Sequence, residues 1–292
     1  MKSKSFGSVF ADVCIWIVIL LMTASCLLPL INMVSISFSD SASASANLVG
    51  LLPINFNLDS YKTLLDDTQF WRSFMISIER VVLGVSLNLV LTILMAYPLS
   101  KTSREFKAKN IYMYTLIFAM LFSGGLIPMF IVVKNLGLID TIWALILPGA
   151  VPIFNVILMM NFFKSVPHSL EEAAIIDGAS KFEILIKIFL PISIPAIATI
   201  ALFSIVGHWN DFFSGLIYMN KASNYPLQTY IQQLNVDITK VTDASQLREL
   251  ASISNKTLNS AKIVVSIVPL LLIYPFLQKY FVTGLVIGSV KE

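Results

Sequence analysis

Charged residues are scarce in this chain, and their scarcity excludes several classes of protein. Asp, Glu, Lys and Arg together make up 13% of the 292 residues, whereas apolar residues make up 57%. This balance is far from the average of soluble domains. The net charge of +3 is too small to indicate a protein that binds nucleic acid. The composition therefore predicts a membrane protein, with membrane lipid and not nucleic acid among its partners.

Cysteine is equally rare, and the two copies lie in the first apolar run. Cys14 and Cys26 are twelve residues apart, which is about 18 Å along a helix, so they cannot bridge each other. The sequence has no spacing of His and Cys that is typical of a metal site. It also lacks the G-x-x-x-x-G-K-[ST] loop that binds nucleotide phosphates. We therefore expect no metal, no cofactor and no ATPase activity of the chain's own.

Long apolar runs are what the sequence has instead, and each is long enough for a helix of about 20 residues that crosses a bilayer. We expect six spans, at residues 13–36, 70–99, 111–133, 142–163, 192–219 and 261–282. The third should be broken at Ser123-Gly124-Gly125 and at Pro128. The first resembles a signal that is processed at Cys26, but its apolar run continues beyond that residue. We expect a retained span, with processing as the open alternative.

The basic residues set the expected orientation. Lys101, Arg104, Lys107 and Lys109 crowd the connection after the second run, which the positive-inside rule places in the cytoplasm. Counting spans from there puts both termini and the segment 164–190 in the cytoplasm, and the loop 220–260 outside. The sequence thus predicts an all-α membrane protein with a single transmembrane domain over residues 1–292.

One polar stretch between the fourth and fifth runs carries strong local signals. It begins PHSLEEAAIIDGASKFE at Pro167. Ser169 and Glu172 are spaced as a capping box, which predicts a short helix over Leu170–Asp177. Gly178 follows, where a helix would end on a residue with positive φ.

The signals then repeat along the same stretch. Ser180 and Glu183 form a second possible capping box. The helix behind it should bury one stripe of apolar residues, namely Phe182, Leu185, Ile186 and Phe189. Two interpretations remain open for this segment: an ordered surface loop, or a docking element for a cytoplasmic partner. The small side chains of Ala173 and Ala174 would let another surface approach closely.

The same stretch resembles the loop that is shared by the membrane subunits of bacterial ABC importers. That loop reads E-A-A, three residues, G, nine residues and I-x-L-P. Here it is matched by Glu172-Ala173-Ala174, Gly178, Ile188, Leu190 and Pro191. Asp177 and the run Trp209-Asn210-Asp211-Phe212 resemble the maltose-type, carbohydrate-importing branch.

The resemblance implies a type I ABC importer permease of the bacterial plasma membrane. Its loop would be the coupling helix, seated in a cleft of an ATPase subunit. The implied coupling residues are Glu171, Glu172, Ala173, Ala174, Asp177, Gly178, Leu190 and Pro191. The implied partners are a second permease subunit, two ATPase subunits that bind the ATP, and an extracellular, lipid-anchored substrate-binding protein.

Polar residues inside the apolar runs are the candidates for a substrate path, because such groups are costly at membrane depth. They are Arg80, Asn155, Trp209, Asn210 and Asp211. An aromatic ring, an amide and a carboxylate within one helical turn suit the faces and hydroxyls of a sugar. The alternatives are an ion pair for Arg80, a bond between helices for Asn155, and an internal bond for Asp211.

We therefore expect a permease subunit for oligosaccharides. An ABC permease for another class of solute, or an ion-coupled secondary carrier, is the alternative. A carrier would need an ion-coupling site and often shows repeated halves, and neither is visible. An intramembrane enzyme is disfavoured because no paired aspartates and no Ser/His constellation occur at membrane depth.

Overall fold

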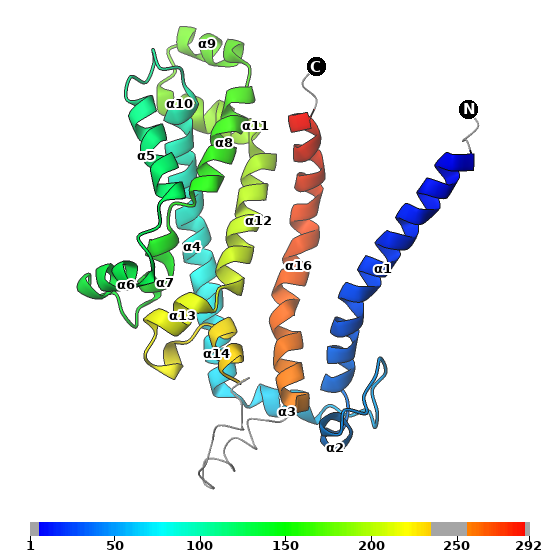
Figure 1. The fold of residues 1–292 in the computed structure, drawn as a ribbon. Coiled ribbons are helices and arrows are strands. Elements are labelled where there is room, and N and C mark those ends of the chain that lie inside the picture. The colour runs from blue at the N-terminus through cyan, green and yellow to red at the C-terminus, as the bar shows by residue number, and fades with distance from the viewer. Residues whose placement is uncertain (1–5, 235–255, 290–292) are drawn as a thin grey trace. The chain divides into compact units, whose positions relative to one another are not determined.

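The computed structural model describes residues 6–234 and 256–289, and every regular element in those ranges is a helix (Figure 1). The chain divides into two compact units. One takes in residues up to 70 together with 233–267, and the other takes in 71–232 together with 268–292. The prediction of one permease domain over residues 1–292 stays a prediction.

The first unit is built on apolar helices tied together by a few polar bonds. Its elements are α1 (Phe6–Ser37), α2 (Ser41–Ser45), α3 (Asp59–Leu65) and the beginning of α16 (Lys256–Ser289). The Ser60 hydroxyl donates to Thr257 Oγ1 at 2.8 Å, and Lys262 pairs with Asp67 at 2.7 Å. Along α1, Trp16, Leu20 and Leu21 and most other apolar side chains are exposed, as in a helix surrounded by lipid.

The second unit contains the remaining helices, packed around one main apolar core. In chain order they are α4 (Thr68–Ser100), α5 (Lys109–Leu121), α6 (Leu126–Asn135), α7 (Ile142–Ile146), η1 (Leu147–Gly149), α8 (Ile153–Ser165), α9 (His168–Ile176), α10 (Lys181–Ile184), η2 (Leu185–Phe189), α11 (Leu190–Ile192), α12 (Ile194–Asn210), α13 (Phe213–Tyr218), η3 (Ala222–Asn224) and α14 (Leu227–Leu234). Ala96, Met159, Phe163, Phe189 and Ile200 lie at the centre of the core. The core joins α4, α8 and α12 to the segment around α9 and η2.

Three described helices are long and apolar enough to cross a bilayer: residues 10–37, 68–100 and 256–276. The number rises to six if each of three bent helix pairs counts as one span. α16 begins at Lys256, five residues before the predicted sixth span, so the end of the predicted outer loop is helical. Residues 235–255 of that loop lie outside the described part of the chain.

The break predicted at Ser123-Gly124-Gly125 is confirmed and is sharper than a kink, whereas the break predicted at Pro128 is wrong because that residue lies in the first turn of α6. The axes of α5 and α6 differ by 114°, with Phe122 extended and Gly125 at φ 89° between them. With ten residues, α6 is about 15 Å long, half of what a bilayer core needs. Residues 111–133 therefore form two differently directed helices and not one continuous helix.

The fourth and fifth runs are also interrupted. The helix before Pro152 and the helix after it differ by 50°, and the helices on the two sides of Ser193 differ by 81°. At the other end, α12 stops at Asn210, and Asp211 is extended with ψ 103°. The predicted fifth span, 192–219, is therefore α12 followed by the separate short helix α13.

Candidate functional sites

The E-A-A segment forms a short helix at one end of the second unit. Figure 1 shows α9 and α10 at the upper end, near the ends of α5 and α8, and α13 and α14 near the opposite end. α9 begins at His168, directly after Pro167, and no side chain caps it. The predicted capping box of Ser169 with Glu172 is therefore wrong. Proline sets the entry with its fixed φ, which leaves Ser169 inside the helix and unable to cap it.

The end of α9 follows the prediction closely. α9 ends at Ile176, one residue before the predicted end, Asp177 is its C-cap, and Gly178 has φ 81°. The N–H of Gly178 donates to the carbonyl of Ile175 at 3.0 Å, and the N–H of Ala179 donates to that of Ala174 at 2.9 Å. No atom lies within 4 Å of a Cβ built on Gly178, so backbone conformation is the constraint there. The second capping box is confirmed: Ser180 Oγ accepts from Glu183 N–H, and Glu183 accepts from Ser180 N–H.

The apolar stripe predicted behind this box is only half right. Leu185 and Phe189 are buried, whereas Phe182 and Ile186 are 61% and 45% exposed. The segment η2 is a π-helix, whose wider turn displaces the stripe that a regular α-helix would bury. Ile184, at 1% exposure, fills the core in place of Phe182.

Leu190 and Pro191, the last residues of the motif, differ in their surroundings. The side chain of Leu190 is half-buried against the main core. Pro191 is exposed and lies at the beginning of α11.

Two adjacent glutamates in α9 have opposite surroundings. Glu171 is 4% exposed, and its carboxylate pairs with Lys101 at 2.6 Å and with Lys181 at 3.3 Å. Glu172 is exposed, as are Ala173 and Asp177. Glu171 therefore holds α9 against the unit, while Glu172 faces outward.

Lys101 is a residue that the sequence interpretation assigned only to orientation. It is buried directly after α4, and its Nζ lies 4.3 Å from the ring centre of Tyr97 and 4.2 Å from that of Phe189. Burial lowers the pKa of Lys101 from its ordinary value, and the hydrogen bond to Glu171 opposes the shift. A lysine at the end of a long apolar helix was the signal available, but nothing local paired it with Glu171.

Beside Glu172, the outward face of α9 carries several exposed apolar side chains. Leu170, Ile175 and Ile176 are 42%, 46% and 85% exposed. Ala174 turns inward and packs against the main core. Exposed apolar side chains next to an anchored helix are typical of a surface that docks onto another protein.

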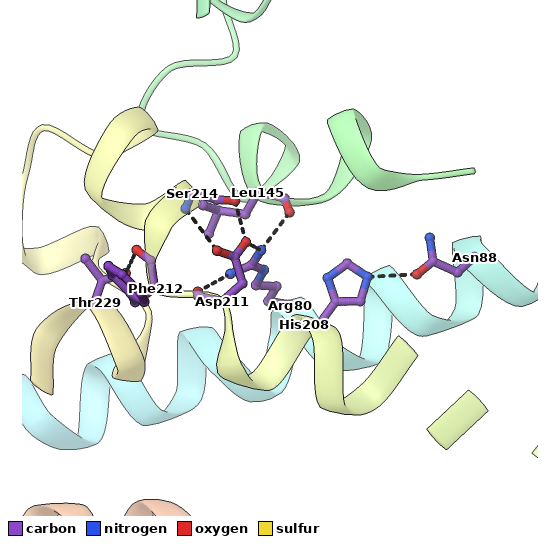
Figure 2. A network of polar contacts seen from close by, with 8 residues as sticks. All are labelled: Arg80, Asn88, Leu145, His208, Asp211, Phe212, Ser214 and Thr229. Atoms are coloured by element: carbon purple, nitrogen blue, oxygen red, sulfur yellow. Dashed lines mark hydrogen bonds and ion pairs between the residues drawn. The ribbon is translucent and has the colours of Figure 1, made fainter. Parts of the chain in front are cut away.

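The second candidate site lies deeper, around a buried ion pair between α4 and the break after α12. Arg80 is 2% exposed, and its Nη2 lies 2.5 Å from Asp211 Oδ2. Its two Nη atoms also donate to the carbonyls of Asp211 at 2.9 Å and Leu145 at 3.2 Å. Asp211 also accepts from the N–H of Ser214 at 3.1 Å and from its hydroxyl (Figure 2).

A cavity of about 330 Å³ opens beside this pair. Of the predicted path residues, Arg80, Asn155 and Asp211 line it, together with Ser204 and His208. The amide of Asn155 reaches Ser204 Oγ at 3.4 Å, which is a contact between helices α8 and α12.

Two further path residues lie elsewhere. Trp209 is buried and meets the ring of Phe74 edge-on at 5.7 Å, and Asn210 is exposed. Neither lines the cavity. Trp209 and Asn210 point to different sides of α12, and Asp211 lies beyond its end, so the three residues face different surroundings.

His208 holds α12 close to α4. Its Nε2 lies 2.9 Å from Asn88 Oδ1 (Figure 2), and the Asn88 amide donates to the carbonyls of Gly149 and Ala150. A Cβ on Gly84 would lie 2.5 Å from His208 Nε2, so a larger residue there would displace the ring. His208 is thus a packing and hydrogen-bonding residue between α4 and α12.

The chain is similar to known proteins over its whole length. The model of the family "Binding-protein-dependent transport system inner membrane component" matches residues 81–286. The polygalacturonan/rhamnogalacturonan transport system permease protein YtcP of Bacillus subtilis is 39% identical over 100% of both chains. Protein LplC of the same organism is 42% identical over 100% of this chain and 98% of its own length.

A solved structure is similar as well. It is a bacterial ABC transporter involved in the import of the acidic polysaccharide alginate. The TM-score is 0.87 at 31% identity, with 96% of this chain and 100% of that chain covered.

Proposed function

The chain belongs to the family of inner membrane components of binding-protein-dependent transport systems, and we propose on this premise how it works. It is the permease subunit of an ATP-driven importer of oligosaccharides. An extracellular binding protein delivers the solute, a second permease completes the path, and two ATPase subunits bind the ATP. The helix α9 is the coupling helix. Both termini and α9 lie in the cytoplasm.

The observation that carries this proposal is the two-sided construction of α9. Its inner side is held by the buried Glu171 with Lys101, and its outer side presents Leu170, Ile176 and Glu172. A helix that is anchored on one side and apolar on the other can transmit a movement of a docked subunit to the core. The alternating access of such a transporter follows when the ATPase pair closes and carries the coupling helices with it.

The oligosaccharide class rests on the relatives and on the chemistry of the cavity. Relatives that transport polygalacturonan or arabinooligosaccharides cover most of this chain, and so does the alginate importer. Asn155 and Ser204 offer amide and hydroxyl groups to a solute with many hydroxyls. Arg80 is the only Lys or Arg among the described residues lining this cavity, and Asp211 neutralises it. A negatively charged sugar would therefore find no unpaired guanidinium or ammonium group there.

The coupling role is tested at Gly178, where only the backbone conformation constrains the residue. Gly178→Val demands a positive φ from a β-branched side chain, which is strongly disfavoured. We expect the variant chain to reach the membrane, but its complex with the ATPase subunits and its sugar uptake should both be reduced about tenfold or more. Co-purification of the ATPase and uptake of labelled oligosaccharide are the measurements.

Two matched variants separate coupling from general strain. Gly178→Asn should retain coupling, because asparagine tolerates positive φ. Gly137→Val creates the same kind of strain at φ 69°, between α6 and α7, far from the E-A-A segment in sequence. It should leave ATPase association intact. Normal association and uptake with Gly178→Val would refute the coupling role of this turn.

A further inference from the structure

A second cavity lies behind α9 and is not explained by coupling or by a solute path. Its volume is about 230 Å³. It is formed by the end of α4, the beginning of α5, the end of α8 and the inner side of α9. The residues that line it are Ser100, Lys101, Thr102, Lys109, Phe163, Lys164, Val166, His168, Glu171 and Phe189.

Positive charge exceeds negative charge in this cavity. Three lysines line it, Lys101, Lys109 and Lys164, against the single carboxylate of Glu171. Both oxygens of Glu171 are engaged, one by Lys101 and the other by Lys181 from outside the cavity. The nearby Glu105 carboxylate accepts from the N–H and hydroxyl of Thr102. Neither glutamate pairs with Lys109 or Lys164.

The two remaining lysines keep donors for a ligand. Lys109 Nζ donates to the backbone carbonyl of Lys101, which uses one of its three N–H groups. Among the described residues, Lys164 has no carboxylate within ion-pair distance. Two ammonium groups at one cavity, with a nearby imidazole of His168, form a site for an anion with several oxygens.

The position of these lysines relative to the apolar helices indicates where the anion comes from. Lys109 begins α5, and the apolar residues of that helix follow from Ile111 onward. Lys164 lies in the last turn of α8, after the apolar run that starts at Ile153. Both amines thus lie where a membrane-crossing stretch meets the membrane surface, which is the depth of lipid phosphates. Ile111, Tyr114 and Phe118 are exposed along α5 and offer an apolar surface to acyl chains.

We propose that this cavity binds the phosphate of an anionic phospholipid, through Lys109 and Lys164, behind the coupling helix. Basic pockets between membrane helices on the cytoplasmic side are suited to such headgroups. The bound phosphate balances the charge that Glu171 leaves uncompensated. It also fills the space between α8 and α9, so the lipid supports the position of α9. The cytoplasmic orientation used here rests on the proposed function.

Lipid binding is measured on the purified full-length chain, without ATPase or transport, so its failure is distinct from a failure of coupling. Native mass spectrometry follows retention of phosphatidylglycerol from mixed micelles with phosphatidylcholine. Lys109→Gln with Lys164→Gln should weaken retention roughly tenfold or more, because two charge-assisted hydrogen bonds are lost. Lys109→Arg with Lys164→Arg should restore it.

The control variant also removes two positive charges, but from lysines outside the cavity. Lys134→Gln with Lys187→Gln alters lysines on α6 and η2 that do not line the cavity, and should retain phosphatidylglycerol like the unmodified chain. An equal loss in this control would show non-specific attraction and overturn the proposal. Thermal melting of each variant establishes that it is folded.

Two further outcomes would also overturn the proposal. Displacement of the lipid by millimolar inorganic phosphate would identify a site for free phosphate. In the assembled complex, loss of ATPase association in Lys109→Gln with Lys164→Gln, with lipid retention unchanged, would mean that the lysines meet a partner's carboxylates. Retention that depends on the two lysines and resists inorganic phosphate supports the lipid site.

Discussion

At the scale of single residues, buried ion pairs hold distant helices of this protein together. Lys101 joins the end of α4 to α9 through Glu171, and Arg80 joins the middle of α4 to Asp211 after α12. Breaking such a pair strands a charge in an apolar environment, which typically costs about 3–5 kcal/mol. For each ion pair, we therefore predict which substitution destabilises the protein more.

The first prediction concerns Arg80 and Asp211. Asp211→Ala strands Arg80, which is 2% exposed, whereas Arg80→Ala leaves Asp211 partly exposed and still bonded to Ser214. We expect both variants to lower the yield of folded protein, with Asp211→Ala the more severe. Size-exclusion yield and melting temperature in detergent are the measurements. Unchanged melting of Asp211→Ala, combined with reduced uptake, would instead make Asp211 a solute-contacting residue.

The second prediction concerns the anchor of α9. Glu171→Leu strands Lys101, so we expect a loss of stability of about 3 kcal/mol or more together with weaker ATPase association. Lys181→Met removes only the exposed partner, whose side chain is 60% exposed, and should cost less than about 1 kcal/mol. The double variant Lys101→Met with Glu171→Leu should recover stability, because neither charge remains. Equal costs of Glu171→Leu and Lys181→Met would contradict the anchor.

At the scale of elements, prolines and glycines decide where the helices break and where two helices can pack closely. The bends at residues 122–125, at Pro152 and at Ser193 divide three apolar runs of the described chain into two helical segments each. Close approach is decided by Gly84, which receives the ring of His208 from α12 against α4. The helix breaks place Asp211 and Leu145 beside Arg80. The hydrogen bonds of Arg80 to these two residues therefore depend on the breaks.

The third prediction tests the contact between α4 and α12. Gly84→Ala would put a Cβ 2.5 Å from His208 Nε2, and the ring is held by Asn88, so overpacking should cost about 1–3 kcal/mol. Gly207→Ala, on α12 with nothing within 4 Å of its Cβ, should cost nothing or stabilise the helix. The melting temperatures of the two variants give the comparison. His208→Ala in the Gly84→Ala background should restore part of the loss.

At the scale of the whole molecule, the distribution of lysines and apolar helices sets the expected orientation. The connection after α4 is basic, and the E-A-A segment lies at the same end of the second unit (Figure 1). α13 and α14 lie at the opposite end. We therefore expect the proposed coupling helix and the α13–α14 region to lie on opposite sides of the membrane.

The fourth prediction follows from this orientation. In a chain with Cys14 and Cys26 replaced by serine, Lys107→Cys should react with an impermeant thiol reagent only from the cytoplasmic side. Lys221→Cys, in the exposed connection after α13, should react only from outside. Labelling of both positions from the same side of intact vesicles would show that the number of spans between them is even and the proposed topology wrong.

Several features were predictable from the sequence because their causes are local. Apolar composition determines the membrane class, and the spaced E-A-A motif determines the family. Gly178 ends α9 with positive φ, and Ser180 caps α10, because both depend on a few neighbouring residues. The break near Ser123 was predictable for the same reason.

The tertiary structure alone decided which polar groups meet. Arg80 and Asp211 are 131 positions apart, and Lys101 and Glu171 are 70 apart, so no spacing rule connects them. It also decided that Glu171 is buried and Glu172 exposed, because packing of α9 against the core selects one side of the helix. The π-turn over Leu185–Phe189 changed the predicted stripe, because core packing prevailed over the regular helical period. Local chemistry thus determined the elements and their ends, and long-range packing determined the sites.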